Sequence, residues 1–391
     1  MSEVRVAAPL VRGRMVGVAA AAGLAAAMGV GRFVFTPLLP IMTASAGISA
    51  GDGALIATGN YAGYLVGALL LARRPGLGTR TLFLIWSLLL VASEVAMAAT
   101  AAVGVHTALR FIAGVAGAAI FIACASTVAQ HRAEGASPGV AFAGVGAGIA
   151  GTGIYTLLAA PHLSWQGLWI GSAVLTAILL VPALLVDIRP ESRPGDTVGT
   201  GSGGPAARRS WRLLLGSYFA EGVGYIIVGT FLVAAVSGTG SASAGALVWT
   251  VVGLAAAVST VAWHAVAGRI GTGPALVTAL LVQAAGTAAA AVSDSVAAAL
   301  VAAVAFGGTF MAVVVLTLDA ARRLGIAHAA AVLTAAYATG QVIGPLLVVP
   351  LVGSSFTSAF ALAALIIVLS AALARAATRV RHRTSGRAVS G

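Results

Sequence analysis

The sequence is poor in charged residues, in cysteine and in lysine. Charged residues make up 8% of the 391 residues, whereas hydrophobic residues make up 60%. A soluble domain carries about 25% charged residues, so this chain lacks the polar side chains that a water-facing surface needs. The mean hydropathy of +1.03 leads to the same conclusion. The composition predicts a membrane protein with room for about twelve spans of roughly 20 residues each.

The chain contains one cysteine, Cys124, which excludes an internal disulfide. Because Cys124 lies in an apolar stretch, we expect a buried structural thiol. The sequence also lacks clustered metal ligands, a phosphate-binding Gly-Lys-Ser/Thr loop and a Ser/His/Asp set in a soluble context. We therefore expect no catalytic residue, no cofactor and no metal, and we disfavour an enzyme, an ATP-driven pump and a receptor.

Lysine is absent, so all 22 basic residues are arginines, and the net charge is +12. Such a charge would suit nucleic-acid binding, but its distribution argues against that partner. Apart from Arg32 and Arg110, the arginines lie before the first apolar stretch or after even-numbered stretches. Cytoplasmic loops of membrane proteins carry an excess of positively charged residues. We predict a multi-pass protein of the bacterial inner membrane with both termini in the cytoplasm and no nucleic-acid partner.

Twelve apolar stretches predict the transmembrane helices. The bilayer core offers backbone groups no water, so a continuous apolar run must cross it as a helix. The first stretch is too long for a signal-peptide core, and we expect it to remain as a span. The predicted fold class is an all-α membrane protein. The expected spans are 15–42, 54–72, 80–100, 104–129, 138–160, 166–186, 213–236, 244–267, 273–292, 296–318, 328–350 and 355–374.

A polar connection divides these spans into two sets of six. Residues 187–212 are basic and rich in Gly, Ser and Pro, which predicts a flexible cytoplasmic linker. We therefore expect an N-terminal half at 1–186 and a C-terminal half with a basic cytoplasmic tail at 213–391. The segments Ala27–Gly31 and Ala220–Gly224 are similar at an offset of 193 residues (220 minus 27). Such repeats predict two pseudo-symmetric six-helix halves that rock about a central site.

Glycines recur in the fifth expected span. Gly144, Gly148 and Gly151 lie three or four residues apart, with Gly146 and Gly153 interleaved. Small residues at this spacing let helix backbones approach closely. General packing by small side chains is the alternative for any one of them.

Four segments resemble one branch of a known superfamily. They are Gly29–Met42 (GVGRFVFTPLLPIM), Asn60–Tyr64 (NYAGY), Ala220–Tyr225 (AEGVGY) and Thr339–Pro345 (TGQVIGP). Together they resemble the YbfB/YjiJ-type branch of the major facilitator superfamily, over nearly the whole chain. The resemblance implies the major facilitator fold of twelve helices and secondary transport by alternating access.

Wider motifs of that superfamily are altered. Arg110–Ala118 resembles the fourth-helix motif with an intramembrane arginine, which implies a place near the cavity for Arg110. The loop after the second helix reads Arg73–Gly76 (RRPG) and lacks the aspartate of the usual Asp-Arg-x-Gly core. Its counterpart Gly268–Gly271 (GRIG) lacks it as well. The usual cytoplasmic charge lock of the outward-open state is therefore in question.

Four ionisable residues lie inside expected spans: Arg32, Glu94, Arg110 and Glu221. A charge at the centre of a membrane helix costs about 2.5–3.5 kcal/mol on insertion scales, and such residues are usually functional. Arg32 can hold a carboxylate or phosphate bidentately, and Glu221 can carry a proton. The alternative is a static Arg32–Glu221 salt bridge. Arg110 and Glu94 could also simply pair with each other.

Polar and aromatic side chains complete the candidate pocket. Asn60 and Tyr64 share a helix face, as do Tyr337 and Gln341, because each pair is four residues apart. Tyr225 occupies the repeat position of Arg32 at the same offset. Binding pockets combine apolar and aromatic walls with a few convergent polar groups. Placement of these aromatic residues at the membrane interface is the alternative.

We predict a secondary transporter that moves a small anionic organic solute by proton-coupled alternating access. The candidate substrate-binding residues are Arg32, Asn60, Tyr64, Arg110, Tyr225, Tyr337 and Gln341, and the proton-coupling residue is Glu221. The alternative is a proton/drug antiporter that exports cationic or lipophilic compounds. Expected partners are the solute, the proton and the lipid bilayer, and we expect a monomer.

Overall fold

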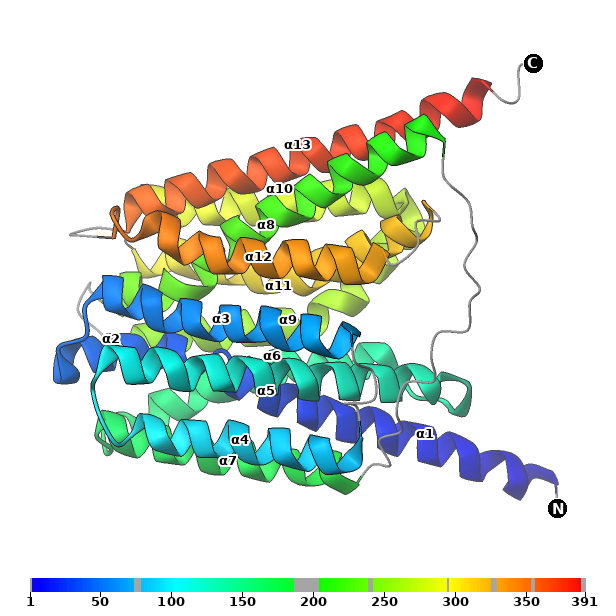
Figure 1. Ribbon diagram of the computed structural model, residues 1–391. Coiled ribbons are helices and arrows are strands. Elements are labelled where there is room, and N and C mark those ends of the chain that lie inside the picture. The colour runs from blue at the N-terminus through cyan, green and yellow to red at the C-terminus, as the bar shows by residue number, and fades with distance from the viewer. Residues whose placement is uncertain are drawn as a thin grey trace. The chain divides into compact units, whose positions relative to one another are not determined.

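The computed structural model describes residues 2–73, 79–185, 204–237, 242–293, 295–324, 329–352 and 356–387. This part of the chain is helical almost throughout and contains no strand (Figure 1). The elements are α1 Ser2–Leu24, η1 Ala25–Val30, α2 Phe35–Ala46, α3 Ala50–Arg73, α4 Arg80–Met97, α5 Val103–Gln130, η3 Arg132–Glu134, α6 Pro138–Ala159, α7 Trp165–Leu185, α8 Pro205–Ser237, α9 Ala242–Ile270, α10 Thr272–Val292, α11 Val296–Arg322, α12 Ala329–Val348 and α13 Thr357–Arg387.

The apolar helices confirm a multi-pass, all-helical membrane protein. Among the described residues, 11 helices are long and apolar enough to cross a membrane. The apolar segment Val332–Val348 within α12 is shorter. These segments match the twelve expected spans one for one, and α1, η1 and α2 together form the first of them.

The chain folds into two compact units. The first comprises Met1–Arg193 and Val233–Val258, and the second comprises Pro194–Leu232 and Ser259–Gly391. The predicted halves at 1–186 and 213–391 remain a prediction. Residues 187–203 of the predicted linker lie outside the described residues. Its last residues are helical, because α8 already begins at Pro205 rather than at 213.

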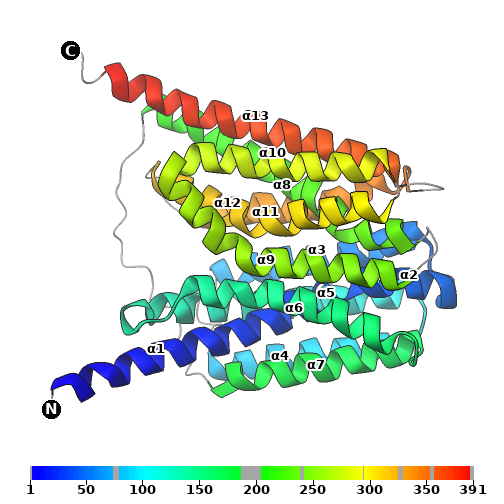
Figure 2. The same ribbon diagram turned by 180° about the vertical axis from the view of Figure 1, so that it is seen from behind.

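In the first unit, α1 packs against α5, α6 and α7, α3 packs against α5, and α4 packs against α5 and α7. The pair α4 and α7 lies side by side in both views (Figure 1, Figure 2). In the second unit, α10 packs against α11 and α13. Helices α8 and α13 are joined there by buried hydroxyls: Ser217 Oγ donates to the Ser370 carbonyl oxygen at 2.9 Å, and Ser370 Oγ donates to that of Ser217 at 2.8 Å.

Glycines let helix backbones touch within the first unit. A Cβ on Gly144 would overlap the Ala21 carbonyl oxygen, and one on Gly148 would lie 2.6 Å from that of Ala25. A Cβ on Gly146 would overlap the backbone nitrogen of Ala257 in α9. The close contact predicted from the glycine spacing is therefore present at these three positions. At Gly151 no neighbouring atom lies within 4 Å.

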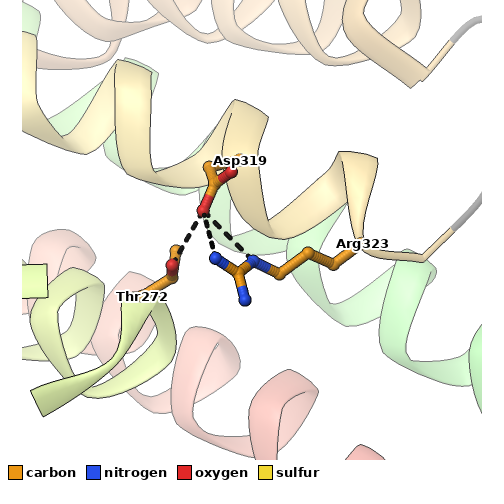
Figure 3. A network of polar contacts seen from close by, with 3 residues as sticks. All are labelled: Thr272, Asp319 and Arg323. Carbon is orange, nitrogen blue, oxygen red and sulfur yellow. Dashed lines mark hydrogen bonds and ion pairs between the residues drawn. The ribbon is translucent and has the colours of Figure 1, made fainter. Parts of the chain in front are cut away.

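A polar network joins the expected cytoplasmic ends of α10 and α11 (Figure 3). Thr272 Oγ1 donates to Asp319 Oδ2 at 2.8 Å, and Arg323 Nε donates to the same oxygen at 3.2 Å. The side chains of Arg323 and Asp319 are 54% and 40% exposed. Asp319 therefore pairs locally, as expected of an acidic residue at a helix end beside arginines.

Candidate functional site

The first span is broken in its middle. The π-helix η1 gives way to a turn over residues 31–34, and regular α-helix resumes with α2 at Phe35. Gly31 N donates to the Ala26 carbonyl oxygen at 2.7 Å, five residues back. Pro37 fits the first turn of α2, where its missing N–H is not needed, and Pro40 lies inside that helix.

Arg110 hydrogen-bonds to the backbone of this break. Its Nη1 donates to the Gly31 carbonyl oxygen at 2.6 Å, and its Nη2 donates to the Arg32 carbonyl oxygen at 2.5 Å. Irregular backbone at membrane depth needs such protein partners, because lipid offers none. The guanidinium also lies 5.7 Å from the Phe35 ring centre and 5.9 Å from that of Trp169. Arg110 is buried and holds the segment that carries Arg32.

Arg32 lies among aromatic rings. Its guanidinium carbon is 4.8 Å from the Tyr64 ring centre, 4.9 Å from that of Tyr61 and 5.4 Å from that of Phe33. Cation–π contacts of this kind stabilise a desolvated cation. The Asn60 amide nitrogen donates to the Arg110 carbonyl oxygen at 3.1 Å. The structure thus brings four of the predicted site residues, Arg32, Asn60, Tyr64 and Arg110, together within the first unit.

Glu94 is the fourth intramembrane ionisable residue, and it lies near Arg110. It is buried and interacts electrostatically with Arg110. Neither of its carboxyl oxygens makes a hydrogen bond to a described residue. The pairing suggested by the sequence is therefore electrostatic, whereas the hydrogen bonds of Arg110 go to backbone.

Glu221 is fully buried in α8 and pairs with an amide of α10. Gln283 Nε2 donates to Glu221 Oε1 at 3.3 Å, and Gln283 is fully buried too. Sequence reasoning missed Gln283. The available signal was the one carboxamide in the span Thr272–Val292, whose other polar side chains are threonines. Buried polar residues in membranes are costly and need a partner.

Aromatic rings stack beside Glu221 in the second unit. Tyr337 of α12 stacks on Tyr218 at 4.4 Å and on Tyr225 at 5.1 Å between ring centres. Tyr225 in turn stacks on Phe306 and Phe310 of α11 at 6.0 and 6.1 Å. Residues 218, 221 and 225 share one face of α8, because they are three and four residues apart. The carboxyl group and the stack therefore belong to one cluster.

The remaining candidate, Gln341, is buried one turn after Tyr337 on α12. The predicted site residues thus form two groups, one in each unit. The second group comprises Glu221, Tyr225, Tyr337 and Gln341. No cluster of three or more potential metal ligands occurs among the described residues.

Many solved structures share the fold of this chain, and two of them are of the nucleoside transporter NupG. A point mutant matches with a TM-score of 0.70 and 14% identity over 93% of this chain and 99% of the other. A second structure matches with a TM-score of 0.70 and 12% identity over 94% and 98%. At 12–14% identity this likeness shows the fold alone.

The chain belongs to the class of major facilitator transporters. Within that class it belongs to the family described as uncharacterised MFS-type transporter YbfB, whose profile matches residues 24–375. The resemblance carried by the four sequence segments is thereby confirmed. No curated protein matches the sequence. The membership places this chain among transporters of small molecules.

Proposed function

We propose that the protein is a proton-coupled secondary transporter of a small organic solute that carries an anionic group. Arg32 binds the anionic group, and Glu221 carries the proton. The observation that supports this proposal best is the environment of Glu221. Its carboxyl group is fully buried in an apolar helix, and its hydrogen-bond partner Gln283 is a neutral amide. A carboxyl group with a neutral partner can gain and lose a proton without breaking an ion pair.

The surroundings of Arg32 support the anion site. Aromatic faces stabilise its charge in an apolar span. The planar N–H groups of a guanidinium match a carboxylate or phosphate bidentately. Arg110 supports the same role indirectly, because it holds the carbonyl oxygens of Gly31 and Arg32.

A second candidate is a planar, uncharged solute such as a nucleoside. The parallel rings of Tyr218, Tyr337 and Tyr225 favour it, because stacked aromatic side chains suit flat rings. NupG is a nucleoside transporter by name, but at 12–14% identity it shares only the fold. Export of cationic or lipophilic drugs is not favoured by these comparisons.

Ligand-induced thermal stabilisation of the purified protein in detergent tests the two candidates. A ligand that binds only the folded state raises the melting temperature by mass action. The panel contains organic acids, nucleosides and cationic drugs, and the proteins are wild type, Arg32→Ala and the exposed-arginine control Arg323→Ala. Stabilisation by organic acids that is lost only in Arg32→Ala supports the anion site. Stabilisation by nucleosides alone, equal in all three proteins, supports the second candidate and rejects the first.

A further inference from the structure

The side chains of Glu221 and Gln283 are chemically complementary. A primary amide offers an N–H donor and one acceptor oxygen, and a protonated carboxyl group offers one O–H donor and one acceptor oxygen. One half of this match is present, because Gln283 Nε2 donates to Glu221 Oε1 at 3.3 Å. Both side chains are fully buried.

The second hydrogen bond of the pair lacks a donor. Glu221 Oε2 and Gln283 Oε1 are both buried and have no hydrogen-bond partner among the described residues. An acceptor that is buried without a donor is destabilising, and two acceptors cannot bond to each other. A single proton on Glu221 Oε2 provides the missing donor for the oxygen of Gln283. One proton therefore satisfies two buried atoms.

We propose that Glu221 and Gln283 form an acid–amide pair that holds the coupling proton, with Gln283 as the positioning residue. In the loaded state the Oε2–H group donates to Gln283 Oε1, while Gln283 Nε2 donates to Glu221 Oε1. Unloading breaks the O–H bond, releases the proton to water on the side to which the site is open and leaves a carboxylate. This inference rests on the proposed role of Glu221 as the proton carrier.

Tyr337 is the other group that faces Glu221. Its hydroxyl lies near the carboxyl group but makes no hydrogen bond within the described part of the chain. The groups that interact with Glu221 from the packed helices are thus Gln283 of α10 and Tyr337 of α12, both uncharged. When the proton leaves, the Tyr337 hydroxyl can turn and donate to the carboxylate. Because the Tyr337 ring stacks on Tyr218 and Tyr225, this change at the hydroxyl links loss of the proton from Glu221 to the aromatic cluster.

Two substitutions of Gln283 separate positioning of the proton from simple packing. Gln283→Met keeps the volume but removes both hydrogen-bonding groups, and Gln283→Glu keeps an oxygen pair that can share a proton. If Gln283 only fills space, Met is tolerated and Glu is harmful. If Gln283 positions the proton, Gln283→Met should lower proton-driven uptake about tenfold, which corresponds to the loss of one strong hydrogen bond. Gln283→Glu should retain proton-driven uptake.

Infrared difference spectroscopy of the purified protein measures the pair without any substrate. The wild type should show the carbonyl band of a protonated carboxyl group, and this band should vanish in Glu221→Gln. The band should shift in frequency in Gln283→Met, because the acid loses its amide acceptor. The matched control is Thr287→Val on the same helix, whose hydroxyl bonds to the backbone of Gln283 at 2.9 Å. It should leave the band unchanged.

The outcomes distinguish this inference from the proposed function. A Glu221 band that is the same in wild type and Gln283→Met overturns the acid–amide pair, even if flux remains proton-driven. A band that shifts as expected while wild-type flux in liposomes ignores the proton gradient supports the pair and rejects proton coupling. If the difference spectrum between acid and alkaline pH contains no band from protonated Glu221, both the acid–amide pair and the role of Glu221 as proton carrier are overturned. Melting temperatures of all variants in detergent verify that each one is folded.

Discussion

The guanidinium of Arg110 donates a hydrogen bond to the backbone carbonyl oxygen of Arg32, at 2.5 Å. One intramembrane arginine thus holds the main chain of another. The same guanidinium bonds to the preceding carbonyl oxygen, that of Gly31, so both bonds lie at the start of the break in the first helix. A residue expected to bind substrate therefore has backbone partners in this structure, and its direct role in binding remains a prediction.

Replacing Arg110 by Leu should destabilise the protein by about 3–5 kcal/mol, because buried partners lose a hydrogen-bonded cation. Arg110→Lys should retain only part of the stability that Arg110→Leu loses, since an ammonium group lacks the planar fork that reaches two carbonyl oxygens. Thermal unfolding in detergent measures the stability. Ligand-induced stabilisation of the two variants measures the binding at Arg32. If Arg110→Lys equals wild type in thermal stability and in ligand-induced stabilisation, the positive charge of Arg110 matters and its two hydrogen bonds do not.

Gly146→Ala should lower the melting temperature, because the new Cβ would overlap the backbone nitrogen of Ala257. The helix backbones must separate to admit it, and loosened packing of this kind costs about 1–3 kcal/mol. Gly151→Ala is the matched control on the same helix, since it has open space around its Cβ. That control should be neutral or stabilising by up to about 1 kcal/mol. Equal effects at both positions would contradict the close contact.

Glu221→Gln should abolish uphill transport driven by a proton gradient, because the amide cannot release a proton. Exchange of labelled for unlabelled solute should persist, since it needs no net proton movement. Glu94→Gln is the control with another buried carboxyl group, and it should keep the pH dependence of transport. Uptake into liposomes with and without a pH gradient measures both activities. Full gradient-driven uptake by Glu221→Gln would reject the assignment of the proton carrier.

Tyr337→Phe should keep the stack on Tyr218 and Tyr225 but remove the hydroxyl that faces Glu221. We expect binding of planar solutes to stay within about twofold of wild type, since the ring area is unchanged. The pH dependence of uptake should change, because the carboxylate loses a donor. Tyr337→Leu should weaken the binding of planar solutes. A Phe variant with an unaltered pH profile would remove Tyr337 from the proton cycle.

Asp319→Asn should change stability by no more than about 1 kcal/mol, because exposed ion pairs contribute little and salt screens them. The pair with Arg323 is half-exposed, and the bond from Thr272 survives as a neutral one. Unfolding in low and high salt measures the difference. A loss of several kcal/mol would show that this network locks the ends of α10 and α11.

The sequence by itself determined the class, the spans and the family of this protein. Apolar runs of span length and the cost of charge in lipid are local properties, so Arg32, Glu94, Arg110 and Glu221 could be placed inside spans and identified as candidate functional residues without a fold. The four family segments are likewise contiguous stretches of chain.

Only the tertiary structure decided which helix faces meet. The break in the first span lies before Pro37, because Arg110 from α5 supplies donors to its carbonyl oxygens. Gln283 is 62 residues from its partner Glu221, and the ring of Tyr337 reaches Tyr218 and Tyr225 from another helix. Such pairings depend on long-range packing of nearly uniform apolar helices, which a linear pattern does not encode.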